Sequence, residues 1–200
     1  MGEREKNNYE PIEKGNEINL PEVAHSRIFE AKRNPNILVK KIRGQLDEIE
    51  EDYKLGRDNF GDLFPDNQLV IAGKNREMAI AYILMSRVYE VALTPENGKV
   101  VLEQLDSIVA KIVGIYLANL ATDQYGSRRG IAPDIYPKNM IFGKTAHSPE
   151  PRWYCVDNYP LLFPEPDSMR DMVNELIKDY SGFYNFPKIT EIIDKLRHLS

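Results

Sequence analysis

The chain has only one cysteine among its 200 residues, Cys155, so it cannot form an internal disulfide. A single cysteine fits the reducing cytoplasm, which is where we expect this protein to act. Its longest apolar run is far too short to cross a bilayer, and residues 1–6 contain no apolar signal region. The sequence therefore predicts a cytoplasmic protein without a membrane partner.

Basic residues are also fewer than acidic residues. The chain has 26 Lys and Arg residues against 31 Asp and Glu residues, which gives a formal net charge of −5. Surfaces that bind nucleic acid are normally basic, so no nucleic-acid partner is expected. The hydrophobic content of 42% is ordinary for a soluble globular protein, and the length suggests one compact domain.

Several motifs that carry chemistry are missing. The sequence has no Gly-x-Ser-x-Gly elbow, no Walker phosphate loop and no Cys-x-x-Cys pair. Its three histidines, His25, His147 and His198, have no metal-ligand spacing. These absences argue against a serine hydrolase, a P-loop enzyme, a thiol oxidoreductase and a histidine metal site.

The most informative stretch runs over residues 130–163. Asp134 and Asn139 precede a short apolar run at 140–142, and a second apolar run at 153–156 leads directly into Asp157. Two short strands joined by a loop predict a hairpin that directs these three polar side chains to one spot. Carboxylate and amide oxygens are the ligands that Mg²⁺ prefers. The stretch therefore predicts a site for magnesium and the phosphate that it accompanies.

Hydrophobic periodicity predicts an α+β protein. Residues 1–17 are polar and are expected to form a flexible N-terminal arm. Strands are predicted at residues 37–42, 69–72, 78–88, 140–142 and 153–156, and helices at 45–60, 99–121, 168–180 and 189–199.

Two of these motifs resemble the protein-kinase-like superfamily. Asp134-x-x-x-x-Asn139 is similar to its catalytic loop, and Asp157-Asn158-Tyr159 is similar to its metal-binding Asp-Phe-Gly turn. The resemblance implies that Asp134 receives the proton of the substrate, while Asn139 and Asp157 hold Mg²⁺ that accompanies ATP. It also implies a two-lobed fold, with an N-lobe of antiparallel strands and one helix at 18–88 and a mainly helical C-lobe at 89–200.

The resemblance further implies a lysine that contacts the ATP phosphates. Lys40, in the strand at 37–42, resembles the third-strand lysine of the family, with Lys41 as the alternative. Neighbouring strand residues face opposite sides, so only one of the two can point into a cleft. Glu50 or Glu51 of the following helix would pair with this lysine, and the sequence does not decide between them.

Three further residues complete the nucleotide contacts that the resemblance implies. Residues 86–88 would form the hinge between the lobes, where backbone groups of Ser86 and Val88 hold adenine. Ile141 is added as a further nucleotide-binding residue, in the strand that follows Asn139.

The sequence departs from the family at two places. Residues 18–30 can be aligned with the glycine-rich loop, but Pro21, Val23 and Ser26 stand where the family has glycines. Ala132 stands two places before Asp134, where the family usually has histidine. The chain is also shorter than a typical protein kinase and has no evident activation segment, so a small, atypical or aminoglycoside-phosphotransferase-like member is expected.

Three functional hypotheses follow. The first is an ATP- and Mg²⁺-dependent phosphotransferase that acts on a hydroxyl of a small molecule or protein. The second, which accounts for both departures, is a catalytically inactive pseudokinase-like scaffold or regulatory binding protein. The third is a globular domain unrelated to kinases, in which Asp134 caps a turn and Asp157 ends a strand.

Overall fold

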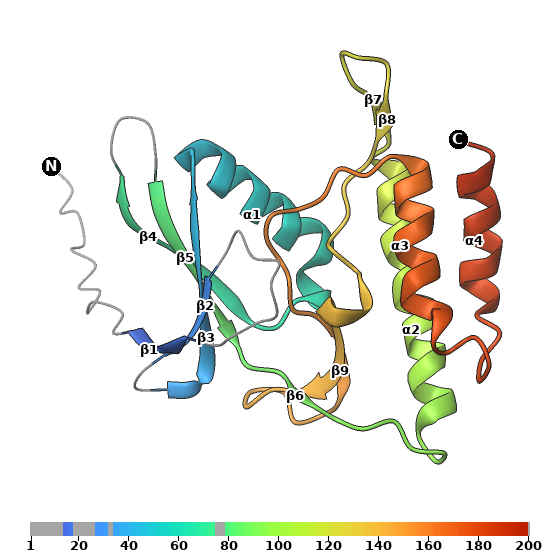
Figure 1. Ribbon diagram of the computed structural model, residues 1–200, viewed down its shortest axis with the longest axis horizontal. Helices are drawn as coiled ribbons and strands as arrows, with labels where there is room; N and C mark the ends of the chain where they lie inside the picture. Colours follow the sequence, from blue (N-terminus) through green and yellow to red (C-terminus); the bar gives the residue numbers. More distant parts are fainter. Residues whose placement is uncertain (1–13, 18–26, 32–33, 75–78, 200) are drawn as a thin grey trace, which may run out of the picture.

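The computed structural model describes residues 14–17, 27–31, 34–74 and 79–199 of the chain. A five-stranded antiparallel sheet lies at one side of the molecule and helices α2, α3 and α4 at the other, with helix α1 between them (Figure 1). The predicted α+β class is confirmed. Among these residues, no helix is both long enough and apolar enough to span a membrane.

The sheet has the strand order β1-β2-β3-β5-β4, and every neighbouring pair is antiparallel. Its central strand β3 is paired with β5 along its length, from Ile37 opposite Ser86 to Gly44 opposite Ala79. The strands are β1 (Lys14–Glu17), β2 (Arg27–Ala31), β3 (Asn34–Gly44), β4 (Asn67–Lys74) and β5 (Ala79–Ser86).

Strand β1 corrects one prediction. Lys14–Glu17 pairs with β2, although these residues were expected to belong to the flexible arm. The pairing partner supplies hydrogen bonds to the backbone, and these do not depend on apolar side chains. A polar composition therefore did not reveal the strand. Of the segment at 18–30 that was aligned with the glycine-rich loop, residues 18–26 lie outside the described residues and residues 27–30 belong to β2.

Helix α1 (Leu46–Phe60) covers one face of the sheet. Ile49 is fully buried and packs with Ile42 of β3 and Ile83 of β5. Because alternate residues of a strand share a face, Lys40 points to the same side of the sheet as Ile42. The helix confirms the prediction for residues 45–60, and it leads into the short 3-10 helix η1 (Gly61–Leu63).

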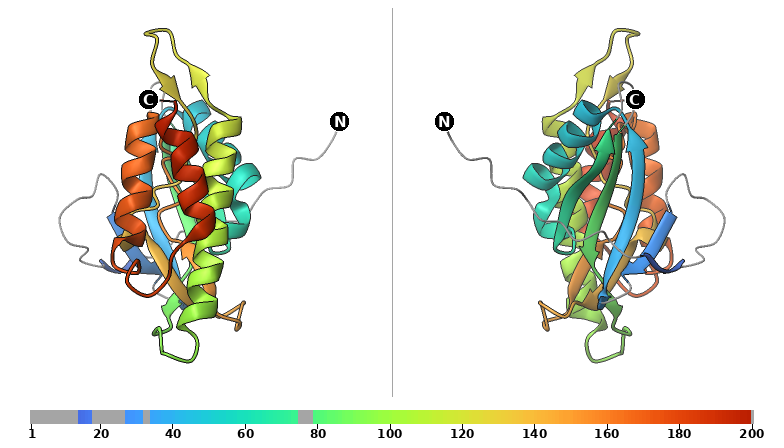
Figure 2. Two further views of the ribbon diagram at one scale, coloured as in Figure 1. Left: turned by 90° about the vertical axis from the view of Figure 1, so that its right-hand side faces the viewer. Right: turned by 90° about the vertical axis from the view of Figure 1, so that its left-hand side faces the viewer.

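The remaining helices pack side by side, as Figure 2 shows from the right-hand side of the molecule. They are α2 (Gly98–Ala118), α3 (Pro166–Lys178) and α4 (Pro187–Arg197). A second sheet with the strand order β10-β9-β6 lies beside α2, and Trp153 Nε1 of β10 donates a hydrogen bond to the carbonyl of Val101 in α2 (2.9 Å). Its strands are β6 (Tyr89–Glu90), β9 (Met140–Lys144) and β10 (Arg152–Cys155).

Helix α2 ends earlier than predicted. It ends at Ala118, and the chain then forms a small hairpin of β7 (Ala121–Thr122) and β8 (Arg128–Arg129), which projects at the top of Figure 1. Gly126 in the turn has a φ of 85°, a conformation that glycine adopts without strain. A two-residue strand has too few positions for periodicity to detect.

Two hydrophobic clusters are present in the part of the chain that the structure describes, and each includes residues from the other half of the chain. Phe60, Leu63 and Phe64 belong to the larger cluster, which is otherwise built from the C-terminal helices and the second sheet. Tyr159 packs against the smaller cluster between the first sheet and α1. The two halves therefore interlock on both sides of the predicted boundary at residues 88 and 89.

Candidate functional site

The predicted hairpin is formed by β9 and β10. Cys155 pairs with Met140 at its open end, and the amide of Val156 donates to the carbonyl of Asn139 (2.8 Å). Asn139 therefore lies just before β9, and Asp157 follows just after β10, at the same end of the hairpin. Asn139 ends the 3-10 helix η2 (Pro137–Asn139).

The side chain of Asn139 is buried, with 7% of its surface exposed, and its Nδ2 has no hydrogen-bond partner among the described residues. An unpaired buried amide is costly, by about 1–3 kcal/mol. Because the group lies at the open end of the hairpin, a polar ligand at this spot would relieve that cost.

Lys40 reaches this spot from β3. Its side chain is 2% exposed, and Nζ lies 2.5 Å from Asp157 Oδ1 and also donates to the backbone carbonyl of Tyr159. A buried ammonium group is tolerated when it is paired and hydrogen-bonded in this way. Lys41 is one residue out of phase and partly exposed. The structure thus brings Lys40, and not Lys41, to Asp157.

Asp134 is held in a loop beside the hairpin. Its Oδ1 accepts a hydrogen bond from the backbone amide of Tyr136 (3.3 Å), and the carboxylate stays partly exposed. Two residues earlier, Ala132 exchanges both backbone hydrogen bonds with Leu162 (3.0 and 2.8 Å). This bridge fastens the chain before Asp134 to the chain that follows Asp157.

Cys155 connects the two acids. Its Sγ lies 3.5 Å from the backbone carbonyl of Asp134 and 3.5 Å from that of Asp157. Burial raises the pKa of this thiol far above its usual value, and the negative charge of Asp157 raises it further. The charge of Asp134 also raises the pKa of the thiol, and the charge of Lys40 lowers it. Cys155 is a neutral packing residue and not a nucleophile.

The structure does not bring the expected glutamates to Lys40. Glu50 and Glu51 are both exposed on α1, and the described ion pair of Lys40 is with Asp157 instead. The physical reason is the rotation of α1 about its axis, which is set by the burial of Ile49 against the sheet.

Two other acids of α1, Glu48 and Asp52, act electrostatically on the phenol group of Tyr159. Burial is the largest cause that raises the pKa of Tyr159, and the negative charges of Asp52 and Glu48 raise it further. The backbone carbonyl of the same residue accepts the hydrogen bond from Lys40. Burial likewise raises the pKa of the Asp52 carboxyl, and Glu51 and Glu48 add to the effect. Glu48 and Asp52 are one helical turn apart, and neither was predicted as a site residue from the sequence. Each directly precedes a residue of the apolar face of the helix, Ile49 or Tyr53, and this position could have drawn attention to them.

Of the other predicted nucleotide contacts, Ser86 and Val88 lie at the connection between the two sheets, and Ile141 lies in β9. Ser86 ends β5, is buried, and its amide donates to the carbonyl of Asp66 (2.8 Å). Val88 leads into β6 and contacts Gly143 of β9, two residues from Ile141. The structure therefore brings Val88 and Ile141 onto neighbouring segments, and their role toward a nucleotide stays a prediction.

The donor set fits a hard divalent cation that retains part of its water shell. Asp157 supplies a carboxylate and Asn139 an amide, from the two segments that meet at the open end of the hairpin. Mg²⁺ typically takes one or two protein oxygens and completes its octahedron with water and phosphate oxygens. Among the described residues, no cluster of three or more His, Cys, Asp or Glu side chains could hold a metal. An all-protein metal cage is therefore not part of the described structure.

No protein-family model matches the chain, and a search of curated proteins found no match. The functional interpretation therefore depends on the geometry of Lys40, Asp134, Asn139 and Asp157, and on the resemblance of the motifs that contain them.

Proposed function

We propose that this chain is an ATP- and Mg²⁺-dependent phosphotransferase of protein-kinase-like fold, which acts on a hydroxyl group of a small molecule or protein. One observation carries the proposal. The buried ammonium of Lys40 lies 2.5 Å from Asp157 Oδ1, at the open end of the hairpin where Asn139 and Asp134 also lie. A paired cation and carboxylate, with a second carboxylate and an amide on adjoining segments, suit a phosphate group with its counterion.

The order of the elements supports the proposal. A five-stranded antiparallel sheet with one helix between β3 and β4 precedes a mainly helical half, as in the two-lobed fold that the resemblance implies. The lysine comes from the first part and the acids come from the second. The segment at 86–88 would then be the hinge between the lobes.

Each side chain has a distinct role in the proposed reaction. Lys40 would bind phosphate oxygens in place of Asp157. Asn139 and Asp157 would hold Mg²⁺, which neutralises part of the phosphate charge when bound. Asp134, the partly exposed acid, would orient the acceptor hydroxyl and take its proton.

Thermal unfolding with ATP and Mg²⁺ tests the binding step. A ligand that binds only the folded state stabilises it by about 2.7 kcal/mol at a concentration one hundred times its dissociation constant, which raises the melting temperature. We expect Lys40→Met and Asp157→Ala to lose this shift. Lys41→Met is the matched control on the other side of the same strand and should keep it. A wild-type protein that shows no shift would contradict the proposal.

Turnover tests the catalytic step. Asp134→Ala should keep the thermal shift with ATP and Mg²⁺ but lose phosphotransfer, because Asp134 contacts the acceptor and not the nucleotide. The loss expected for a general base is about 10²–10⁴-fold. Unchanged turnover in this variant would remove Asp134 from the mechanism.

A non-catalytic, pseudokinase-like binding protein is the second candidate. Two observations favour it: Ala132 stands where the family usually has histidine, and Pro21, Val23 and Ser26 stand where the family has glycines. A wild-type protein that shows an ATP-dependent shift but no turnover would select this candidate.

A further inference from the structure

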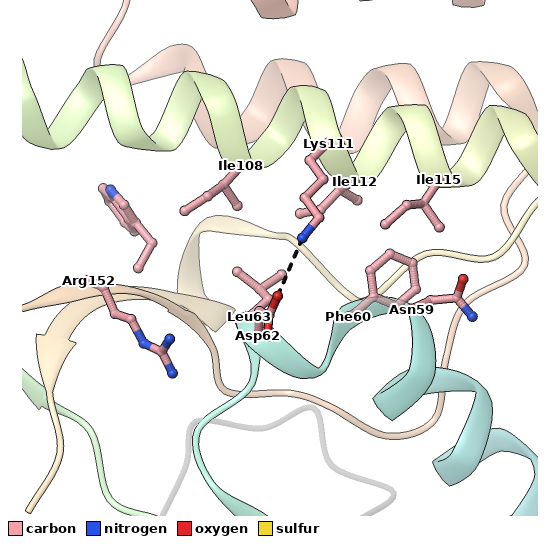
Figure 3. A pocket seen from close by; sticks show the side chains of 10 residues that line it. Asn59, Phe60, Asp62, Leu63, Ile108, Lys111, Ile112, Ile115 and Arg152 are labelled. Carbon is pink, nitrogen blue, oxygen red and sulfur yellow. Dashed lines mark ion pairs between the residues drawn. The ribbon is translucent and has the colours of Figure 1, made fainter. Parts of the chain in front are cut away.

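A cavity separate from the candidate site lies between α2 and the end of α1, and it has a volume of about 190 Å³ (Figure 3). Lys40, Asp134, Asn139 and Asp157 do not line it. Its function must therefore be argued separately from that of the candidate site.

The walls of this cavity are apolar. Ile108, Ile112 and Ile115 project into it from one face of α2, and Phe60 and Leu63 oppose them (Figure 3). Trp153 of β10 also lines it. An apolar cavity of about 150 Å³ is large enough to hold one benzene ring. This cavity therefore suits a group the size of a single aromatic ring or a short branched chain.

The charged side chains that line the cavity are two cations and one acid. Lys111 extends from α2 toward Asp62 of η1, and Figure 3 shows this ion pair crossing the space between the two elements. The two charged atoms are 3.6 Å apart, and the side chains are 63% and 93% exposed. An ion pair this exposed is weak and screened by water, so a competing anion can displace Asp62.

Arg152 is the second cation at the same cavity. Its guanidinium lies over the ring of Tyr154, 4.7 Å from the centroid, and it has no carboxylate partner among the described residues. Arg152 and Ile108 also line a wider, more open recess of about 660 Å³. The cavity thus combines an apolar interior that is large enough for one aromatic ring with two cationic side chains, Lys111 and Arg152. It also has one carboxylate, that of Asp62, in a weak ion pair.

From this combination we infer that the cavity under α2 binds a small amphipathic carboxylate, namely a monocyclic aryl or short-chain aliphatic acid. The apolar body lies between Ile112 and Leu63, and the carboxylate replaces that of Asp62 on Lys111, with Arg152 beside it. The inference does not depend on the proposed phosphotransferase activity.

The chain provides its own probe for this site, because Trp153 is the only tryptophan. We expect titration with phenylacetate to change Trp153 emission saturably, and the neutral isostere phenylacetamide to bind about fivefold more weakly, the upper end for an exposed charge interaction. Calorimetry at the same concentrations decides the result if the emission stays constant. Absence of binding by both methods, or equal binding of acid and amide, would overturn the inference.

Two exposed substitutions should have opposite effects. Lys111→Gln should weaken phenylacetate binding about fivefold, and Asp62→Asn should strengthen it several-fold because the competing carboxylate is gone. Lys99→Gln, on the same helix but outside the cavity, is the matched control. If Lys111→Gln and Asp62→Asn both leave the affinity unchanged, the carboxylate does not bind here.

Two further variants locate the ligand. Ile108→Phe should fill the opening and abolish binding, while thermal unfolding verifies that the variant is folded. Asp157→Ala should bind phenylacetate as the wild type does. Loss of binding in Asp157→Ala protein that thermal unfolding shows to be folded would place the ligand in the candidate phosphate site and overturn the inference.

Discussion

Cys155 shows how one buried side chain can organise a polar site. Its thiol contacts the backbone of both Asp134 and Asp157 and lies in the core, with no exposed surface. Sequence reasoning assigned it to a buried strand, which the structure confirms. Its contact with the carbonyl of Asp134 could not be predicted, because it depends on how a loop 21 residues earlier in the chain packs against β10.

The raised pKa of Cys155 predicts that its thiol is unreactive in the folded protein. Burial and the charge of Asp157 raise the pKa well above the ordinary value of 9.0, so the folded protein keeps the thiol proton even at pH 9. We expect no reaction with a disulfide reagent in the native state at this pH and one equivalent after unfolding in urea, measured by the absorbance of the released thiolate. Rapid reaction of the folded protein would show that the thiol is accessible.

At the scale of single elements, β6 and β9 approach each other unusually closely at Gly143. A Cβ atom at this position would lie 2.4 Å from the carbonyl oxygen of Tyr89 and 2.8 Å from Val88 Cγ1. Only glycine, which has no Cβ atom, allows the backbone of β6 to approach β9 this closely at position 143. Gly143 therefore helps to position the segment that contains the predicted nucleotide contact Val88.

Gly143→Ala should consequently destabilise the protein by about 1–3 kcal/mol, because the two strands must separate. Gly114→Ala is the matched control. A Cβ atom at Gly114, in α2, would meet no atom of a neighbouring element within 4 Å, so alanine there should stabilise by about 1 kcal/mol. Urea denaturation of both variants measures the two changes. Equal effects at the two positions would contradict the role of the close approach.

Helix α4 receives its N-terminal cap from another helix. The two carboxylate oxygens of the fully buried Asp106 in α2 accept the amides of Lys188 (3.2 Å) and Ile189 (2.9 Å) at the start of α4. An acid at a helix N-terminus satisfies amides that have no partner within the helix. Asp106 lies among the apolar, buried residues of α2, which is an unusual position for an acid. Sequence reasoning did not use this position to predict the cap.

Asp106→Ala should therefore destabilise the protein by about 2 kcal/mol, since two buried amides lose a charged acceptor. Asp194→Ala, an exposed acid within α4, should change the free energy of unfolding by less than about 0.5 kcal/mol. Urea denaturation followed by circular dichroism compares them. A loss in Asp106→Ala no larger than that of the control would show that the cap is dispensable.

For the whole molecule, the interlocked hydrophobic clusters predict a single unfolding transition. Phe60 and Leu63 pack with the C-terminal helices, and Tyr159 packs with the first sheet, so neither cluster is complete without the other half. We expect the thermal transition seen by Trp153 emission to coincide with that seen by far-ultraviolet circular dichroism. Two separated midpoints would show that the halves unfold independently.

The elements with strong periodicity were predictable from the sequence, while their mutual orientation was not. The strand with Lys40, the helix at 45–60 and the hairpin of β9 and β10 follow from local apolar patterns, because a pattern is a property of consecutive residues. Which acids of α1 face the site depends on how Ile49 packs against a strand that is distant in sequence. Glu50 and Glu51 were therefore predicted as partners of Lys40, although both are exposed and Lys40 pairs with Asp157.

The backbone bridge between Ala132 and Leu162 closes residues 132–162 into a ring, and this ring contains Asp134, Asn139 and Asp157. The three polar groups thus belong to one closed segment of the chain, whereas Lys40 belongs to β3, which lies outside this segment. A rigid-body shift of the first sheet would change the separation of Lys40 and Asp157 and leave the spacing within the ring intact. Any opening or closing of the candidate site would then displace the cation relative to a fixed set of oxygen-bearing side chains.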